Sequence, residues 1–149
     1  MKDIRLVENE LDLETYLALR ASVGWKVLTD EQAKKALEHS LFTVCAYLDD
    51  EPVGMGRVVG DGAVICYIQD LIRHPKASGL GVGRMIMKRL ISYVKEEQLP
   101  GTEIMLDLMC ARGREAFYES LGFLARPTEK LGPGMIMYLK KDACILEEE

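Results

Sequence analysis

A glycine-rich segment in the middle of the chain has the composition of an anion-binding loop. Residues 78–84 read Ser-Gly-Leu-Gly-Val-Gly-Arg, follow an apolar strand-like run and open a segment with helical spacing. Free backbone N–H groups and the positive end of a helix dipole should therefore face the loop. Glycines also let phosphate oxygens approach the backbone without meeting Cβ atoms. The segment predicts a site for a phosphate or pyrophosphate group.

Two familiar phosphate loops do not fit this segment. A Walker A loop requires Lys and then Ser or Thr after its last glycine, but Arg84 and Met85 follow Gly83. A dinucleotide-binding fingerprint requires its third glycine where Arg84 stands, and it normally lies in the first strand-helix unit of its domain. A glycine-rich helix start that binds no ligand remains the alternative.

Apolar patterning predicts the elements that must position the loop. Strand-like runs cover residues 4–7, 42–48, 53–59, 64–72, 104–109 and 135–139. Helical spacing covers residues 13–23, a segment that follows a capping-box pattern at Thr29 and Gln32, a segment from Val82 that ends before Pro100, and residues 115–121. This order predicts one α/β (α+β) domain, residues 1–149, whose mixed sheet combines an antiparallel meander with a strand-helix-strand crossover.

Composition limits the classes of function. The 149 residues are 48% hydrophobic and carry a formal net charge of −5, which suits one globular domain with its own core. No dense block of Lys and Arg is available to neutralise phosphates, so we expect no nucleic-acid partner. The first residues contain no apolar signal segment, and no apolar run reaches the ~20 residues that span a bilayer. We therefore expect a cytoplasmic protein without membrane association.

The cysteines indicate a reducing compartment and no metal site. They lie far apart, form no Cys-x-x-Cys pair and have only two histidines as possible nitrogen partners: Cys45, Cys66, Cys110, Cys144, His39 and His74. Zinc sites need closely spaced ligands, so we expect no bound metal. The cysteines in apolar runs are expected to pack as small hydrophobic side chains.

Two further segments extend the pattern around the glycine loop. His74-Pro75 precedes it, and Phe-Tyr-Glu-Ser-Leu-Gly-Phe follows at residues 117–123. Together these residues resemble the GNAT superfamily of acetyl-CoA-dependent N-acetyltransferases. In that family a strand ends in x-Pro, a loop of pattern Arg/Gln-x-x-Gly-x-Gly/Ala binds the pyrophosphate of acetyl-CoA, and a later helix carries Tyr in a Tyr-x-x-x-Gly-Phe context. The matching residues are Pro75, Gly81, Gly83, Tyr118, Gly122 and Phe123.

The resemblance implies a fold and an acetyl-CoA site. The family's sheet is mixed and mostly antiparallel, has six or seven strands, carries helices on both faces and is splayed between its fourth and fifth strands. Acetyl-CoA is then expected to contact Leu71, Ile72, Arg73, Ser78, Gly79, Leu80, Gly81, Val82, Gly83, Arg84 and Tyr118. Ser78 stands where the family usually has Arg or Gln, so Arg84 or Lys76 would have to supply the missing positive charge.

The resemblance also implies a reaction in which an amine attacks the acetyl thioester directly. The backbone N–H of Leu71 or Ile72 would polarise the thioester carbonyl, and Tyr118 would give a proton to the departing thiolate as the general acid. Asp70 is the first candidate for the base that takes the proton of the amine, with Asp107 as a weaker one. The alternatives are structural: Asp70 pairs on a polar face of the sheet, and Tyr118 packs as an aromatic side chain.

We expect the acceptor to be a primary amine of a small molecule. In this fold the N-terminal helices and the central strands would form its pocket, with lining residues Trp25, Asp30, Phe42, Tyr67 and Gln69. Acidic side chains favour a cationic amine such as a polyamine, an aminoglycoside or an arylalkylamine. The alternatives are a protein N-terminal or lysine acetyltransferase and a non-catalytic acyl-CoA-binding or regulatory module. A homodimer is compatible with the family, where dimers are common.

Overall fold

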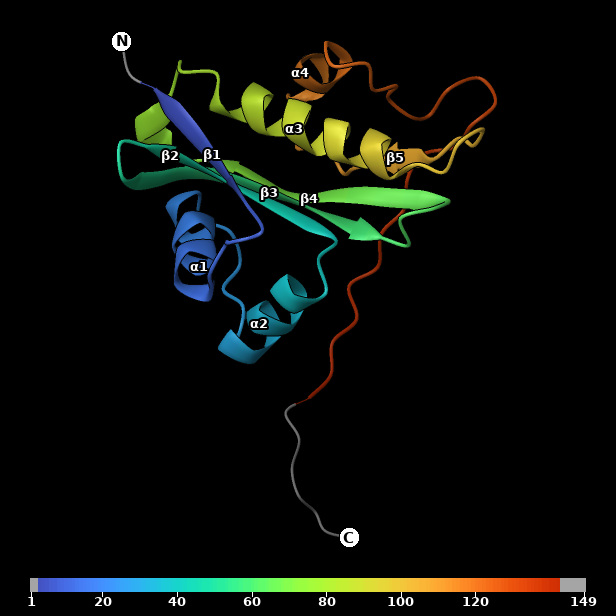
Figure 1. Cartoon of the computed structure of the whole chain (residues 1–149). Helices are drawn as coiled ribbons and strands as arrows, with labels where there is room; N and C mark the ends of the chain where they lie inside the picture. The colour runs from blue at the N-terminus through green and yellow to red at the C-terminus, as the bar shows by residue number, and fades with distance from the viewer. Residues whose placement is uncertain (1–2, 143–149) are drawn as a thin grey trace, which may run out of the picture. The chain divides into compact units, whose positions relative to one another are not determined.

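The computed structural model describes residues 3–142, and contacts within the chain divide it into two compact units, Met1–Met109 and Cys110–Glu149. The elements of the first unit are β1 (Ile4–Glu8), α1 (Leu13–Ser22), α2 (Asp30–Glu38), β2 (Phe42–Leu48), β3 (Glu51–Gly60), β4 (Ile65–Arg73), a short 3-10 turn (Pro75–Ala77), α3 (Val82–Glu97) and β5 (Met105–Asp107), as Figure 1 shows. The second unit contains α4 (Glu115–Glu119).

The strands form one mixed sheet in the order β1-β2-β3-β4-β5. Neighbours among the first four strands run antiparallel, whereas β5 runs parallel to β4. The parallel pair is connected through α3, so the predicted meander and crossover are confirmed. The sequence predicted six or seven strands, however, and the described part of the chain has five.

The predicted strand at residues 135–139 is the first difference, and that prediction is wrong. The structure gives these residues no regular secondary structure, and their side chains are exposed, from 62% for Ile136 to 88% for Met135. The segment has the apolar composition of a strand, but a strand also needs a neighbour that pairs its backbone N–H and C=O groups. β5 is shorter than predicted for the same reason, since it ends at Asp107, where its pairing with β4 ends.

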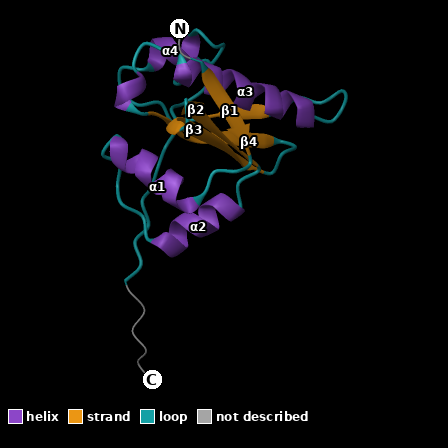
Figure 2. Cartoon of the chain, turned by 60° about the vertical axis from the view of Figure 1, so that its left-hand side comes forward, coloured by secondary structure: helices purple, strands orange, loops and turns teal. Residues whose placement is uncertain are grey.

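Helices cover both faces of the sheet in the first unit. α1 and α2 lie on one face and α3 lies on the other (Figure 1 and Figure 2). On the first face Tyr16 and Leu19 of α1 pack against Met55 and Ile72 of the sheet. On the second face α3 buries a stripe of residues at helical spacing: Val82, Ile86, Met87, Leu90 and Val94. The face on which a strand residue lies therefore decides which helices it can contact.

Local signals explain where the helices begin and end. Asp12 caps α1, and the Thr29 hydroxyl caps α2 by accepting from the N–H of Gln32 at 3.0 Å. The second contact confirms the capping pattern read from the sequence. α3 ends at Glu97, ahead of Pro100, as predicted.

In the second unit, a turn stops α4 and reverses the chain. The N–H of Phe123 donates to the carbonyl of Tyr118 at 3.2 Å, and Gly122 has a φ of +105° that favours glycine. The first five residues of the predicted helix at 115–121 are confirmed, since α4 covers Glu115–Glu119.

Across both units, no helix among residues 3–142 combines the length and the apolar character needed to cross a membrane.

Candidate active site

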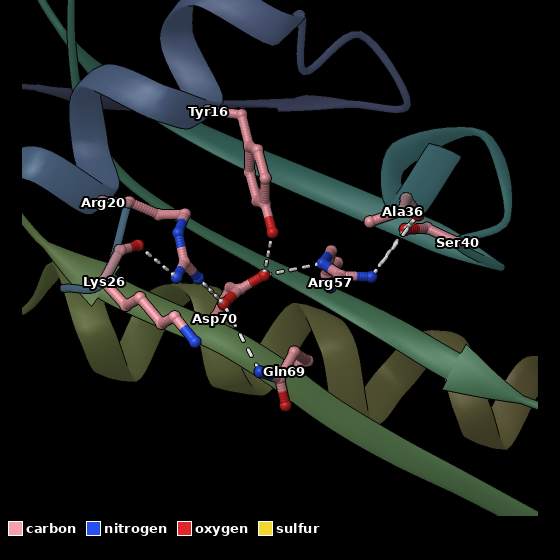
Figure 3. Close-up of polar contacts among 8 residues, drawn as sticks. All are labelled: Tyr16, Arg20, Lys26, Ala36, Ser40, Arg57, Gln69 and Asp70. Carbon is pink, nitrogen blue, oxygen red and sulfur yellow. Dashed lines mark hydrogen bonds and ion pairs between the residues drawn. The ribbon is translucent and has the colours of Figure 1, made fainter. Parts of the chain in front are cut away.

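The strand β4 contains a bulge at Asp70. Two residues of β4, Asp70 and Leu71, oppose only Gly56 of β3, because the register shifts between the pairs on either side. Asp70 has a φ of +58°, in the left-handed region that Asp and Asn adopt more readily than other non-glycine residues. A bulge changes the direction of the side chains beside it. Here the Asp70 carboxylate points toward α1 (Figure 3).

β4 extends past the end of β5. The parallel ladder joins only the first three residues of β4, Ile65 to Tyr67, to Met105–Asp107 of β5. The following part of β4, through Leu71 and Ile72 to Arg73, has its ladder with β3 alone in the described residues. The residues expected to hold the acetyl thioester therefore lie beyond the end of the β4–β5 pairing.

The glycine loop before α3 has an arrangement that fits a phosphate ligand. Gly79 and Gly81 have φ values of +81° and +75°, and an added Cβ at either position would meet no atom within 4 Å. Gly81 is the N-cap of α3, and no side chain caps this helix. The first N–H groups of α3 thus have no side-chain partner at the cap, and the open space beside the glycines gives an anion access to them.

Two basic residues, Lys76 and Arg84, lie beside the loop. Apart from the glycines, three of the predicted contact residues are exposed: Ser78, Leu80 and Arg84. Val82 is buried in the core, so only its backbone is available to a ligand. Lys76 forms an ion pair with Glu51 at 2.6 Å, and this contact lowers the pKa of Glu51. The charge of Lys76 is already engaged by Glu51, so we expect a pyrophosphate to bind mainly through backbone N–H groups, with Arg84 as the second basic residue at the loop.

Four donors surround the Asp70 carboxylate (Figure 3). The hydroxyl of Tyr16 and Nε of Arg57 donate to Oδ2 at 2.5 and 2.7 Å. Nη1 of Arg20 and Nε2 of Gln69 donate to Oδ1 at 2.9 and 3.5 Å. The Asp70 side chain is 1% exposed. A carboxylate has about four acceptor positions, so an amine would have to displace one of these donors before Asp70 could take its proton.

The sequence reasoning did not identify Tyr16, Arg20 and Arg57 as site residues. Burial, and after it the hydrogen bond to Asp70, raises the pKa of Tyr16, so its phenol stays protonated and donates at neutral pH. Arg57 also donates from Nη1 to the Ser40 hydroxyl at 3.2 Å. One signal was available, since Arg57 stands inside an apolar strand and a charged residue is rarely buried without a partner.

Polar side chains gather on the face of the sheet that α1 and α2 cover. Cross-strand partners share a face, and Arg57 pairs with Gln69 while Tyr67 pairs with Asp107. Tyr67 and Gln69 also share a face because they are two residues apart. The structure therefore brings two of the predicted acceptor residues, Tyr67 and Gln69, to the same face as Asp70 and Asp107. We call this set, with Arg57, the acceptor face.

The other three predicted acceptor residues lie elsewhere. Phe42 lies on the opposite face of the sheet, where its ring stacks on Tyr93 of α3 at a centroid distance of 4.2 Å. Asp30 is exposed at the first position of α2. Trp25 lies in the loop between α1 and α2, is 40% exposed, and has the guanidinium carbon of Arg20 5.4 Å from its ring centroid. The structure does not bring Phe42 to the acceptor face.

Tyr118 has an aromatic environment within the second unit. Its ring lies edge-to-face with Phe117 and Phe123, at centroid distances of 5.0 and 6.1 Å. Burial, and after it Cys110, raises the pKa of the phenol above its ordinary value of about 10, while Arg114 opposes the shift. The hydroxyl is therefore protonated at neutral pH, as a general acid requires.

Comparison with known proteins connects this architecture to one family. Residues 9–123 match the model of the acetyltransferase (GNAT) family. Serotonin N-acetyltransferase 2, chloroplastic, of Oryza sativa subsp. japonica is 30% identical over 131 residues, which cover 83% of this chain and 62% of that relative. The chain thus spans less than two thirds of the length of this relative.

Solved structures share the fold. A probable acetyltransferase from meticillin-resistant Staphylococcus aureus is 31% identical, with a TM-score of 0.79 over 92% of this chain and 100% of that chain. An aminoglycoside N-acetyltransferase solved in complex with CoA is 16% identical, with a TM-score of 0.67 over 94% of this chain and 96% of that chain, which shows the fold alone. Because the family model matches from the residue after β1 through α4, the chain belongs to the acetyltransferase (GNAT) family.

Proposed function

We propose that the chain is an N-acetyltransferase that moves acetyl from acetyl-CoA to the primary amine of a small molecule by direct attack. The observation that carries the proposal is the uncapped start of α3 beside the open space at Gly79 and Gly81. The family uses acetyl-CoA, and a pyrophosphate is the part of that molecule a helix start would bind. The end of the β4–β5 pairing after Tyr67 is compatible with the splayed sheet expected for the family.

The two parts of the proposed donor site meet at Gly54 of β3. A Cβ on Gly54 would lie 2.7 Å from Cγ1 of Val82 and 2.9 Å from the carbonyl oxygen of Ile72. The first turn of α3 therefore lies against the stretch of β4 that continues past β5. We propose that backbone N–H groups of residues 81–84 hold the pyrophosphate and that residues 71–73 hold the pantetheine arm. When bound, acetyl-CoA supplies an activated thioester.

Backbone and side-chain donors then act on the reacting atoms. The N–H of Leu71 or Ile72 donates to the thioester carbonyl oxygen as negative charge develops on it; loss of one donor of this kind typically costs about 10²–10³ in kcat. Tyr118 gives its proton to the departing thiolate. A free thiol has a pKa of about 8.5 and a phenol about 10, so the transfer is slightly uphill. The burial that raises the pKa of Tyr118 adds to this cost but keeps the acid protonated.

The attacking amine must lose a proton before it can react. For an alkylammonium with a pKa near 10.4, this costs roughly 4–5 kcal/mol at pH 7. Asp70 was the first expected base, but four donors occupy its oxygens. We propose that Asp107, the second carboxylate of the acceptor face, accepts the proton directly or through a water. Proton uptake by Asp70 is the alternative, and the pH profile of Asp70→Asn decides between them.

Among the amines expected from the sequence, we propose an arylalkylamine first. Arg20 and Arg57 both pair with Asp70, so this carboxylate gives the acceptor face no net negative charge to attract a polyamine or an aminoglycoside. The exposed indole of Trp25 offers an aromatic surface instead. The rice relative is named for serotonin, which is an arylalkylamine.

Turnover by the full chain tests the proposal. The protein is offered acetyl-CoA with an arylalkylamine, a polyamine, an aminoglycoside or a lysine peptide, and thiol release and the N-acetyl product are measured. We expect the arylalkylamine to give the highest kcat/KM. Turnover of the peptide alone would show a protein acetyltransferase, and calorimetric binding of CoA without turnover would show a binding or regulatory module. Absence of CoA binding would contradict the proposal altogether.

A further inference from the structure

The loop between α1 and α2 contacts both the backbone and the side chain of Arg20. The N–H of Trp25 donates to the backbone carbonyl of Arg20 at 3.1 Å. Nη2 of Arg20 donates to the Lys26 carbonyl at 2.9 Å (Figure 3). The guanidinium carbon of Arg20 lies 5.4 Å from the centroid of the Trp25 ring, which is within the range of a cation–π contact. Arg20 therefore holds both the backbone and the aromatic ring of this loop.

Arg20 is in turn held by the bulge of β4. Its Nη1 donates to Oδ1 of Asp70 at 2.9 Å, and the Arg20 side chain is 11% exposed. Tyr16 and Arg57 fix the other oxygen of Asp70. Arg20 thus contacts both the buried carboxylate of Asp70 and the indole of Trp25. A substitution at Asp70 can therefore change the position of the Trp25 ring through Arg20.

Trp25 is exposed, unlike the large residues of α1 that pack in the core. Tyr16 and Leu19 of α1 are buried at 0% and 1% exposure, whereas Trp25 is 40% exposed. A large, rigid ring at the surface binds another ring at a low cost in conformational entropy, and more so when its position is already fixed. The contacts from Arg20 fix the position of this ring.

We propose that Asp70 is a positioning residue that acts through Arg20 to hold Trp25 in place, and that Trp25 is a specificity-determining residue that packs against an aromatic part of the acceptor. This inference rests on the proposed function. It assigns Asp70 to acceptor binding, while Asp107 takes the proton. Loss of the Asp70 charge should therefore raise the KM for the acceptor and leave the pH dependence of kcat in place.

Intrinsic fluorescence tests the anchor without any need for activity. Trp25 is the single tryptophan of the chain, so quenching by acrylamide and fluorescence anisotropy report on this ring alone. We expect Arg20→Gln and Asp70→Asn each to increase the quenching constant and to lower the anisotropy. Arg20→Gln removes the cation beside the ring and the bond to the Lys26 carbonyl, whereas Asp70→Asn removes the carboxylate charge that orients Arg20. Unchanged quenching and anisotropy in both folded variants would overturn the proposal that Asp70 and Arg20 hold Trp25 in place. If Arg20→Gln does not fold, Arg20→Lys serves as the second variant. It keeps the positive charge but loses the planar guanidinium group, so it should also increase the quenching constant and lower the anisotropy.

Arg89→Gln is the matched control. Arg89 also joins carboxylates and an aromatic ring, since it donates to Glu8 at 2.6 Å and Glu96 at 3.2 Å and lies 5.0 Å from the ring centroid of Phe42. It belongs to α3 and makes none of the contacts of the α1–α2 loop. We expect this variant to keep the quenching constant of Trp25 and the acceptor KM.

A double-mutant cycle separates positioning from a general loss of structure. Trp25→Ala and Arg20→Gln should each raise the KM for an aromatic amine about tenfold and leave kcat and CoA affinity in place. In the Trp25→Ala background, Arg20→Gln should raise the KM little further, because the ring through which Arg20 acts on the acceptor is already absent. Fully additive effects would show that Arg20 does not act through Trp25. Loss of the pH dependence of kcat in Asp70→Asn would show that Asp70 takes the proton. If no amine is acetylated, the proposed function fails. The quenching and anisotropy of Trp25 still show whether Asp70 and Arg20 hold this ring in place.

Discussion

Gly81 and Gly101, beyond opposite ends of α3, both have a positive φ that favours glycine. Their φ values are +75° and +77°, and an added Cβ would meet no atom within 4 Å at either position. Gly81 is the N-cap of α3, whereas Gly101 follows the other end of the helix. A substitution therefore strains the backbone at both positions, but only at Gly81 would the new Cβ lie at the start of α3.

The pair gives a controlled test of the pyrophosphate site. A left-handed alanine costs roughly 1–2 kcal/mol in backbone energy, so Gly81→Ala and Gly101→Ala should lower the melting temperature to a similar extent. Only Gly81→Ala places a Cβ where a phosphate oxygen would approach, and we expect it to weaken CoA binding by about tenfold or more. Calorimetric titration with CoA measures this difference. Equal CoA affinities in the two variants would contradict a pyrophosphate site at this loop.

Gly54 and Gly56 of β3 allow α3 to pack close to the sheet. A Cβ on Gly54 would meet Cγ1 of Val82 at 2.7 Å and a backbone oxygen of β4 at 2.9 Å, whereas a Cβ on Gly56 would meet the ends of two side chains, Leu90 at 2.9 Å and Ile86 at 3.0 Å. Overpacking of this kind costs about 1–3 kcal/mol, so both alanine variants should melt earlier.

The two variants should differ in CoA affinity. Gly54→Ala pushes against the first turn of α3, so it should weaken CoA binding. Gly56→Ala acts further along the helix and should leave CoA binding close to that of the unsubstituted chain. Thermal unfolding and CoA titration of both proteins check this prediction. A loss of CoA affinity in both variants would point to a general displacement of α3.

Tyr118→Phe tests the general acid. The substitution keeps the ring and its contacts with Phe117 and Phe123, so stability and CoA affinity should change little. General acid catalysis contributes about 10²–10⁴-fold, and we expect kcat to fall within that range. The loss should shrink with an acetyl donor whose thiol is more acidic, because that leaving group needs less help. Full kcat in Tyr118→Phe, when chemistry limits the rate, would show a packing role only.

The raised pKa of Tyr118 also predicts a pH range. A phenol whose pKa lies above about 10 stays protonated from neutral pH up to that value. The contribution of Tyr118 should therefore persist through neutral and mildly alkaline pH and disappear only as pH rises past its pKa. The ratio of kcat between the unsubstituted chain and Tyr118→Phe, measured across pH, follows this directly. A ratio that already falls to one below pH 9 would contradict the assignment.

Much of the first unit could be predicted from local sequence. The run at 42–48 coincides with β2, Thr29 caps α2, and α3 starts at Val82 and stops before Pro100. These features depend on residues close together in the chain. Segment 135–139 shows the limit of such reasoning, because apolar composition gives a preference for a strand but supplies no neighbouring strand to pair with.

The candidate site depended more on contacts between distant residues. Tyr16 and Asp70 are separated by 54 positions, and their contact requires both the packing of α1 and a bulge that only the β3–β4 register reveals. The sequence identified Asp70 but not the donors that occupy its oxygens. Phe42 shows a second limit, since alternation along a strand separates two faces without telling which helices cover each face. The glycine loop needed no distant partner, and its residues carried the family resemblance.

Asp107→Asn, compared with Asp70→Asn, tests which carboxylate takes the proton of the amine. Asp107 lies at the end of β5 opposite Tyr67, on the acceptor face. If Asp107 accepts the proton, its amide variant should lower kcat at neutral pH by about 10²–10⁴-fold. The deficit should close as pH rises toward the ordinary pKa of an alkylammonium, about 10.4, because the amine is then already neutral in solution.

A weakly basic amine supplies the internal control for this comparison. An aniline-type acceptor is neutral at pH 7 and needs no base before it attacks, so Asp107→Asn should lose little activity with it. Asp70→Asn should instead raise the acceptor KM for both amines and keep the pH dependence of kcat, since the Asp70 carboxylate is occupied by Tyr16 and the two arginines. An equal loss for both amines in Asp107→Asn would assign Asp107 to binding or structure. The proton would then leave to water or to a displaced Asp70.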